Sequence, residues 1–186
     1  MATSTRIAKR YAKALMNQAL ADKSLESIHA DFTTIITALH ASNELMSLII
    51  SPVIRHTSKV AILKEIFEGK ISQLMMNFLV MITEKKRESV LPEISASFTE
   101  LYNAEKNLVP VEFTSSVELD EALKAKLIDV IAKRTGKTVL SSFNVNADLK
   151  GGITIRIADT MIDASLRHQL DKLYHELSGS GTSVFA

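Results

Sequence analysis

The most informative stretch of this chain is residues 151–167, which read Gly-Gly-Ile-Thr-Ile-Arg-Ile-Ala-Asp-Thr-Met-Ile-Asp-Ala-Ser-Leu-Arg. Isoleucine occupies every second position of 153–157, and this period of two is typical of a half-buried strand. The glycine pair in front of it allows backbone angles that other residues avoid. Residues 158–160 have turn chemistry, and Met161 and Ile162 are long enough for a short returning strand. The stretch therefore predicts two strands joined by a tight turn.

The period of the sequence changes after Asp163. Apolar side chains then recur three and four positions apart, as on one face of an amphipathic helix, at Leu166, Leu170, Leu173, Tyr174 and Leu177. A pair of strands followed by such a helix is a structural unit. Nothing in its residue types indicates catalysis.

The same stretch resembles the C-terminal signature of the delta subunit of F-type ATP synthases, the family that includes the mitochondrial oligomycin sensitivity-conferring protein. That signature consists of two glycines, an alternating apolar strand, an aspartate, an apolar pair and then Asp-x-Ser-x-Arg. This sequence fills it with Gly151, Gly152, Asp159, Ile162, Asp163, Ser165 and Arg167. The resemblance implies a structural role for these residues.

The composition is that of an ordinary globular protein. A chain of 186 residues can form one sizeable domain or two small ones, and its apolar fraction is 46% with 23% charged residues. Cysteine is absent, which excludes disulfides, thiolate metal sites and cysteine nucleophiles. The formal net charge of +1 favours neither nucleic acid nor anionic lipid as a partner. A neutral, soluble, helix-rich protein is expected.

No stretch is long enough to cross a membrane as a helix. The longest uncharged stretch of the first half, residues 71–83, has 13 residues, whereas a span needs roughly 20. Four cations precede the first acid, Asp22, and a mitochondrial presequence has the same character. We favour a basic first helix of the folded domain, because its apolar face continues to Gln18 and Ala19 without a small-residue cleavage site.

The first 105 residues predict a series of six helices. Ser24, Asn43 and Ser72 are expected to cap the second, third and fifth helices. The expected ranges are 5–21, 25–40, 44–50, a fourth helix opened by Thr57 or Ser58 and ended by Gly69, 72–86 and 91–106. The fifth helix is apolar nearly all round, which indicates either a central position or a surface shared with a partner.

The character of the chain changes after residue 106. A strand at 109–113, a helix at 119–134 and a strand at 138–145 precede the stretch 151–167. Pro110 indicates that the first of these is an edge strand or begins there. The expected fold class is mainly α with a smaller α/β region: an N-terminal six-helix bundle over residues 1–105, followed by a C-terminal strand-helix-strand-strand-helix module over residues 106–186.

The resemblance extends along the whole chain, because further landmarks of the family occur in order: Arg10–Leu15 in the first helix, Ser51-Pro52-Val53-Ile54, Asn77-Phe78-Leu79, and Lys86-Arg87 shortly before Leu91-Pro92-Glu93-Ile94. It implies a non-catalytic peripheral-stalk subunit, or stator. Such a subunit links the catalytic head of ATP synthase to the membrane-anchored b subunits, so that the head does not rotate with the rotor during proton-driven ATP synthesis. No catalytic residue, cofactor or metal is implied.

The family also implies partners for each region. Its N-terminal bundle binds an amphipathic N-terminal helix of the alpha subunit between the first and fifth helices, and its C-terminal region contacts the b subunits. The matching groove positions are Tyr11, Ala14, Phe78, Met81 and Ile82. Of these, Tyr11 and Met81 are expected to be partner anchors rather than core residues. One copy per complex is implied, held at the membrane only through the complex, on the cytoplasmic face of a bacterial inner membrane or on a plastid or mitochondrial membrane.

Three motifs that suggest chemistry have better structural explanations. Gly136-Lys137-Thr138 lacks the earlier glycine of a phosphate-binding loop, and Gly136 suits a helix C-cap. His175-Glu176 would need a second histidine at position 179, which is glycine. Asp159 and Asp163 suit turn and helix-start roles better than a metal site.

Two other classes of function are less favoured by the residues. An enzyme would need a cluster of perturbed titratable groups. A helical nucleic-acid-binding or regulatory adaptor protein would need a basic face wider than Lys85-Lys86-Arg87, so no nucleic-acid partner is expected.

Overall fold

The computed structural model describes residues 2–51, 53–158 and 160–179, and within these ranges it describes side chains from residue 5 to residue 174. The chain divides into two compact units, residues 1–105 and 106–186. The described residues are mainly helical, with eight α-helices and one small mixed sheet of four strands.

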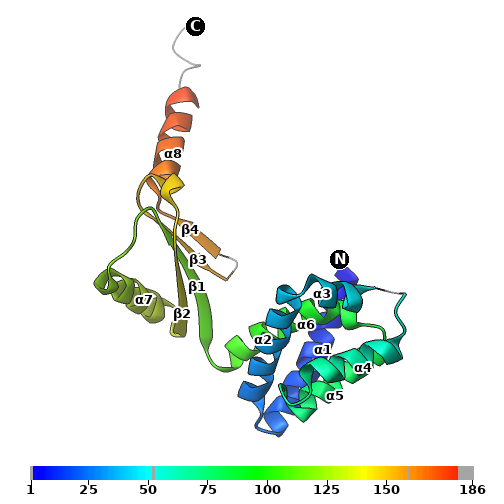
Figure 1. Ribbon diagram of the computed structural model, residues 1–186. Coiled ribbons are helices and arrows are strands. Elements are labelled where there is room, and N and C mark those ends of the chain that lie inside the picture. Colours follow the sequence, from blue (N-terminus) through cyan, green and yellow to red (C-terminus); the bar gives the residue numbers. More distant parts are fainter. Residues whose placement is uncertain (1, 52, 159, 180–186) are drawn as a thin grey trace. The chain divides into compact units, whose positions relative to one another are not determined.

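The first unit consists of helices that share one core (Figure 1). They are α1 (Ala2–Ala21), α2 (Leu25–Ala41), α3 (Asn43–Ile50), α4 (His56–Phe67), α5 (Gln73–Glu84), the short 3₁₀ helix η1 (Glu88–Val90) and α6 (Leu91–Glu105). Phe32 lies at the centre of the core, and its ring centroid is 5.0 Å from that of Phe98 and 6.3 Å from that of Phe78. Aromatic side chains of α2, α5 and α6 thus hold these three helices together.

Small side chains let α1 lie along α6. Ala8, Ala12 and Ala19 of α1 are fully buried and recur at the spacing of one helix face. Because a methyl group occupies little space, the two helices can approach closely there. Larger side chains of α1, such as Tyr11, are left at the border of the core.

Of the three expected helix caps, two are confirmed in position and one is wrong, and the fourth helix also starts earlier than expected. Ser72 caps α5, where its hydroxyl accepts from the N–H of Met75, and Ser24 precedes α2 without making a side-chain capping bond. Ser42, and not Asn43, caps α3 by accepting from the N–H of Leu45 at 3.2 Å. The fourth helix begins one residue before Thr57. His56 is its first helical residue, and Arg55, with extended backbone angles, occupies the N-cap position.

The second unit is built on one sheet. Its elements are β1 (Leu108–Ser115), α7 (Glu121–Thr135), β2 (Thr138–Val145), the 3₁₀ helix η2 (Ala147–Leu149), β3 (Ile153–Ile157), β4 (Thr160–Asp163) and α8 (Leu166–Gly179). The strand order is β2-β1-β3-β4, with β1 parallel to β2 and the other neighbours antiparallel. Asp120 caps α7, one residue after the expected start, and its carboxylate accepts from the N–H of Leu123 at 2.6 Å.

Pro110 was expected to mark either an edge strand or a strand start: the edge strand is wrong, because β1 is an interior strand, and the position near the strand start is confirmed. The ladder to β3 begins only at Val111, whereas the ladder to β2 already includes Pro110. Proline cannot donate a backbone hydrogen bond. It is tolerated here because it lies at the start of the strand, ahead of the pairing with β3.

The two faces of the sheet differ in chemistry. Val109, Val111 and Phe113 of β1 form a core with Ile131 of α7, and the Phe113 ring stacks on Phe143 at 4.8 Å. Alternate residues of the same strands point to the other face, and they are mostly polar: Glu112, Thr114, Thr154, Arg156 and Asp163. Helix α7 therefore covers one face only, and the polar face lies opposite it.

The two glycines lie where the start of β3 passes close to the segment that enters α8. A Cβ on Gly152 would lie 2.3 Å from the carbonyl oxygen of Ala164, and a Cβ on Gly151 would lie 2.4 Å from Leu166 Cδ1. Gly152 also has a φ of +80°, which L-residues rarely adopt. The expected conformational role is confirmed for Gly152, and the close approach of the Ala164 backbone is a second reason for a glycine there, whereas the Leu166 side chain near Gly151 could rotate away.

Candidate functional site

The five residues expected to bind a partner helix fall into two groups. Tyr11 is half-buried, Ala14 is exposed and Met81 is 38% exposed. Phe78 and Ile82 are only 6% and 1% exposed and belong to the core. A helix lying on the surface could therefore contact Tyr11, Ala14 and Met81 directly, while Phe78 and Ile82 support the bundle beneath.

The exposed members of this set adjoin one contact between α1 and α5. The ring of Tyr11 meets the ring of Phe78 edge-on, with centroids 6.4 Å apart. Ala14 and Met81 each lie three residues further along their helices, on the same side as Tyr11 and Phe78 respectively. We refer to Tyr11, Ala14 and Met81 as the α1–α5 strip.

The C-terminal signature builds the start of α8. Ser165 is 1% exposed, its hydroxyl accepts from the N–H of His168 at 3.2 Å, and its own N–H donates to the Asp163 carboxylate at 2.9 Å. The hydroxyl of Ser165, followed by its backbone N–H, lowers the pKa of Asp163 below its ordinary value, because both favour the charged carboxylate. Arg167 is exposed in the first turn of α8, and Asp159 lies outside the described residues.

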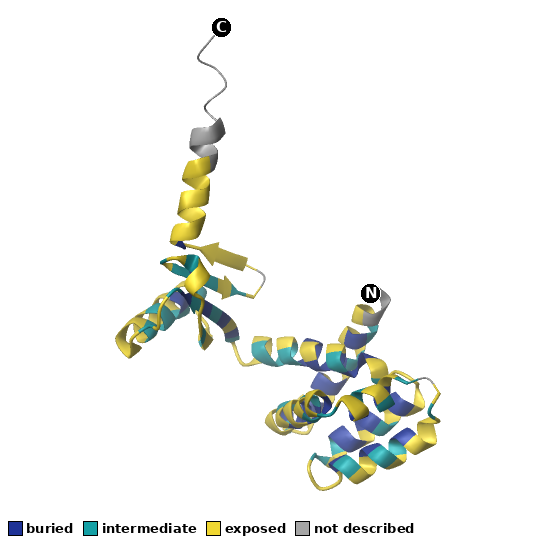
Figure 2. Cartoon of the chain, turned by 45° about the horizontal axis from the view of Figure 1, so that its top comes forward, coloured by how far each residue is buried: buried dark blue, intermediate teal, exposed yellow. Residues whose placement is uncertain are grey.

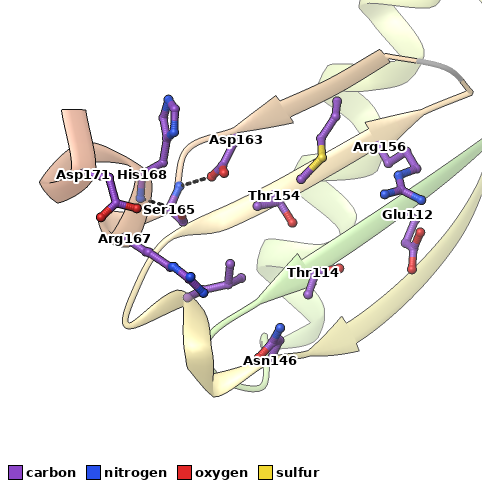
Figure 3. A pocket seen from close by; sticks show the side chains of 12 residues that line it. Glu112, Thr114, Asn146, Thr154, Arg156, Asp163, Ser165, Arg167, His168 and Asp171 are labelled. Atoms are coloured by element: carbon purple, nitrogen blue, oxygen red, sulfur yellow. Dashed lines mark hydrogen bonds between the residues drawn. The ribbon is translucent and has the colours of Figure 1, made fainter. Parts of the chain in front are cut away.

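A polar hollow of about 380 Å³ lies on the sheet face opposite α7 (Figure 3). Strands β1, β3 and β4 form its floor, and the first turns of α8 close one side. It contains both signs of charge, from Glu112, Arg156, Asp163, Arg167 and Asp171. Asn144 donates to Glu112 at 2.7 Å, which holds that carboxylate on the sheet. Such a mixed surface suits contact with a polar surface of another chain.

The described part of helix α8 is exposed (Figure 2). It also carries the most exposed apolar face of this unit. Leu166, Leu170, Leu173 and Tyr174 are 47% to 71% exposed and share one face at i, i+4, i+7 and i+8. The side chain of Leu177, the fifth residue expected on this face, lies outside the described residues. The sequence pattern predicted this apolar face. The structure adds that no element among the described residues covers it.

One further pKa shift lies on α7. The carboxylate of Glu121 accepts from the ammonium of Lys124 at 2.7 Å and raises the pKa of that lysine. Lys124 also lies over the ring of Phe143, 5.6 Å from its centroid. The contact of Lys124 with Phe143 joins α7 to strand β2.

Neither a membrane span nor a metal cluster is found in the described part of the chain. Its helices are too short or too polar to cross a bilayer. Its histidine, aspartate and glutamate residues form no group of three that could hold a metal ion.

Exposed apolar side chains in ordered rows on helices are characteristic of subunits that bind other chains within an assembly. The fold and these two surfaces define a helix-rich binding subunit. Residues 7–177 match the family described as the ATP synthase delta (OSCP) subunit, and the chain belongs to that family. It is a peripheral-stalk component of F-type ATP synthase and a non-catalytic subunit of that complex.

Curated relatives agree with this assignment. ATP synthase subunit delta of Chlorobium chlorochromatii is 34% identical over 91% of this chain and 94% of its own length. The subunit of Desulforamulus reducens is 32% identical over 88% of this chain and 91% of its own length. The relatives are matched along nearly their whole length, so both units of this chain are part of the family pattern.

Solved structures agree in fold. A chain of the Toxoplasma gondii mitochondrial ATP synthase hexamer has a TM-score of 0.73 at 22% identity, covering 92% of this chain and 97% of that chain. A chain of the Polytomella F-ATP synthase has a TM-score of 0.51 at 18% identity, covering 53% of this chain and 88% of that chain. At these identities the likeness supports the fold.

Proposed function

We propose that this chain connects two parts of the synthase: residues 1–105 bind the N-terminal helix of the alpha subunit, and residues 106–186 bind the b subunits. The catalytic head is thereby held against the rotor during proton-driven ATP synthesis. The observation that carries this proposal is the apolar face of α8, because four large side chains there are exposed in one row.

The α8 face has the geometry of a helix-pairing surface. Apolar residues at i, i+4, i+7 and i+8 form a stripe that a second amphipathic helix can cover. Burying four such side chains contributes on the order of 1 kcal/mol for each, because about half of each side chain is still exposed, before the cost of association is subtracted. A long helical stalk subunit is a partner of the right shape.

The α1–α5 strip supports the second contact. Tyr11 offers an aromatic ring and Met81 a flexible apolar side chain, while Ala14 leaves room for a backbone to approach. These are the residue types found at helix-in-groove contacts. A stator resists torque, so two separate and tight contacts at one copy per complex suit the task.

The location follows from the complex. The chain is a peripheral subunit of a membrane complex. We place it on the cytoplasmic face of a bacterial inner membrane, because the two curated relatives named above are bacterial, and we infer that it is held there only through its partner subunits.

The test uses the full chain and two variants. Leu170→Glu with Leu173→Glu places charges on the α8 face, and Val130→Glu is the control because Val130 is equally exposed on α7. The double variant should lose binding to the water-soluble part of the b subunits while an alpha N-terminal peptide still binds with unchanged heat. Retention of b binding by the double variant, or loss of both bindings in the control, would contradict the proposal.

A further inference from the structure

Strand β2 forms one edge of the sheet in the second unit. Its outer side pairs with no strand of the described chain, because the strand order is β2-β1-β3-β4. Its eight residues, which read Thr-Val-Leu-Ser-Ser-Phe-Asn-Val, include no charged residue and no proline. The register with β1 is continuous from Thr138 to Val145, so the strand has no bulge. β2 is therefore a long and regular edge strand.

The two edges of this sheet are protected to different degrees. Folded proteins usually protect an edge strand by short length, charged side chains, proline or a bulge, because its free backbone groups can pair with another chain. The opposite edge has two of these features, since β4 has only four residues and one of them is Asp163. β2 has none of them. An edge that binds a partner strand would have this character.

Two backbone hydrogen bonds identify which groups of β2 face outward. The N–H of Thr138 donates to the carbonyl oxygen of Asn107 at 3.0 Å, and the N–H of Asn146 donates to that of Ser115 at 2.7 Å. Alternate residues of a strand direct their backbone groups to the same side. The even-numbered residues of β2 therefore pair with β1, and the outward N–H and C=O groups belong to Val139, Ser141, Phe143 and Val145.

These outward groups are available for pairing. No backbone hydrogen bond crosses the outer edge of β2 to another described residue. Apolar side chains lie beside them, since Leu140 is 46% exposed and Val145 is 60% exposed. An added strand gains affinity from main-chain hydrogen bonds and specificity from its alternate side chains. The β2 edge offers both.

The α8 face alone is small for the proposed contact with the b subunits. Its four exposed side chains offer roughly 400 Å², whereas a stable interface covers about 800 Å² on each partner. The β2 edge is close enough to add to it. β2 leads into η2, which lies against α8, and the carbonyl oxygen of Gly151 accepts from the N–H of Leu166 at 2.9 Å. A chain that covers the start of α8 can therefore continue along β2.

We propose that an extended segment of the b subunits pairs with the outer edge of β2 and continues the sheet, in addition to the helix that covers the α8 face. The segment alternates apolar and polar side chains. Its apolar ones lie beside Val139 and Phe143, which face the core under α7, and its polar ones lie beside Ser142 and Asn144 on the opposite face. The inference rests on the proposed contact of residues 106–186 with the b subunits and specifies the form of that contact.

Two substitutions at one position test the pairing in the full chain. Ser141→Pro removes an outward N–H without removing a hydrogen bond to β1, and edge strands tolerate proline at such positions. Its affinity for the water-soluble part of the b subunits, measured by isothermal titration calorimetry, should fall roughly tenfold. Ser141→Ala is the matched control, because it keeps the N–H and should bind like the unaltered chain. Equal affinity of the two variants would overturn the inference.

Hydrogen exchange in the unaltered chain gives a second readout that does not depend on how a variant folds. In the free chain, the four outward N–H groups should exchange faster than the even-numbered ones that are bonded to β1. Binding of the b subunits should slow these four by about tenfold or more, as followed by NMR. A helix that only covers α8 would leave them unchanged.

The outcomes distinguish this inference from the proposed function. If the b subunits bind and the four N–H groups exchange as fast as before, the contact through α8 stands and the strand pairing is wrong. If the b subunits do not bind the full chain at all, both are wrong. If the same four N–H groups are slowed simply by raising the concentration of the free chain, the edge pairs with a second copy, and the inference is also overturned.

Discussion

The ammonium group of Lys59 in α4 is buried and pairs with the carboxylate of Glu88 in η1. Lys59 is only 2% exposed, and the same ammonium donates to the carbonyl oxygen of Ile49 at 2.7 Å, in the last turn of α3. One side chain therefore joins three elements of the first unit. The second carboxylate oxygen of Glu88 is buried without a hydrogen-bond partner among the described residues, so Glu88 depends on Lys59 for compensation of its charge.

Lys59→Met should destabilise the chain by about 3 kcal/mol, because it leaves the carboxylate of Glu88 buried and unpaired. Chemical denaturation followed by circular dichroism measures this loss. Lys64→Met on the exposed side of α4 is the matched control and should cost less than about 0.5 kcal/mol. Combining Lys59→Met with Glu88→Leu should recover most of the stability; a double variant as unstable as the single one would show that the pair is not the cause.

Gly152→Ala and Gly136→Ala separate backbone strain from steric conflict. Both glycines have positive φ, +80° and +67°, but a Cβ at Gly136 meets nothing within 4 Å. Gly136→Ala should cost about 1 kcal/mol from its backbone angle, and Gly152→Ala about 1 to 3 kcal/mol more from the conflict with the Ala164 carbonyl. Thermal unfolding of the two variants gives the comparison. Equal losses would mean that the segment entering α8 moves away freely.

Asp163 makes the stability of the second unit depend on pH. Its pKa is lowered in the folded state, so the charged form favours folding above the ordinary pKa of an aspartate, and this contribution is lost as the pH falls through the lower folded value. In an NMR titration, Ser165→Ala should raise the pKa of Asp163 towards its ordinary value. Ser142→Ala, an exposed serine of β2, should leave it unchanged. An unaltered titration in Ser165→Ala would exclude the hydroxyl as the main cause.

Alanine substitutions at Tyr11, Met81 and Phe78 should change the affinity for the alpha peptide and the stability of the chain to different degrees. Met81→Ala removes an exposed side chain and should cost little stability but weaken alpha-peptide binding, on the order of tenfold or more. Phe78→Ala removes a core ring and should cost about 3 to 5 kcal/mol of stability. Tyr11→Ala should affect both, because its ring is half-buried against Phe78. Unchanged affinity in Met81→Ala would remove it from the strip.

Residues 1–105 should fold without the rest of the chain, because the buried apolar side chains of α1 to α6 form a core of their own. The fragment should show strong helical dichroism and one cooperative thermal transition. A fragment with helical signal but no cooperative unfolding would show that the second unit is needed to complete the first.

Local periodicity was sufficient to predict the α-helices and the strands, although not the two 3₁₀ helices. The alternation over residues 153–157 and the 3.6-residue pattern after Asp163 predicted β3 and α8, because backbone type depends on which neighbours along the chain share a face. Glycine at positions 136 and 152 likewise indicated the positive φ that each adopts. The ends of helices were less certain, since Ser42 and Asn43 are both good caps and a shift of one residue costs little.

Tertiary structure decided which apolar residues are buried. The fifth helix is apolar nearly all round, so its sequence could not separate the buried Phe78 and Ile82 from the exposed Met81; the separation depends on where α2 and α1 lie. The α8 face looks in sequence like any core-facing stripe, and it is a candidate interface because no described element covers it. The interior position of β1 in the sheet also depends on residues distant along the chain. The same is true of the steric conflict between a Cβ on Gly152 and the carbonyl oxygen of Ala164. Local patterns record the preference of each residue for a face, whereas burial is a property of what packs against that face.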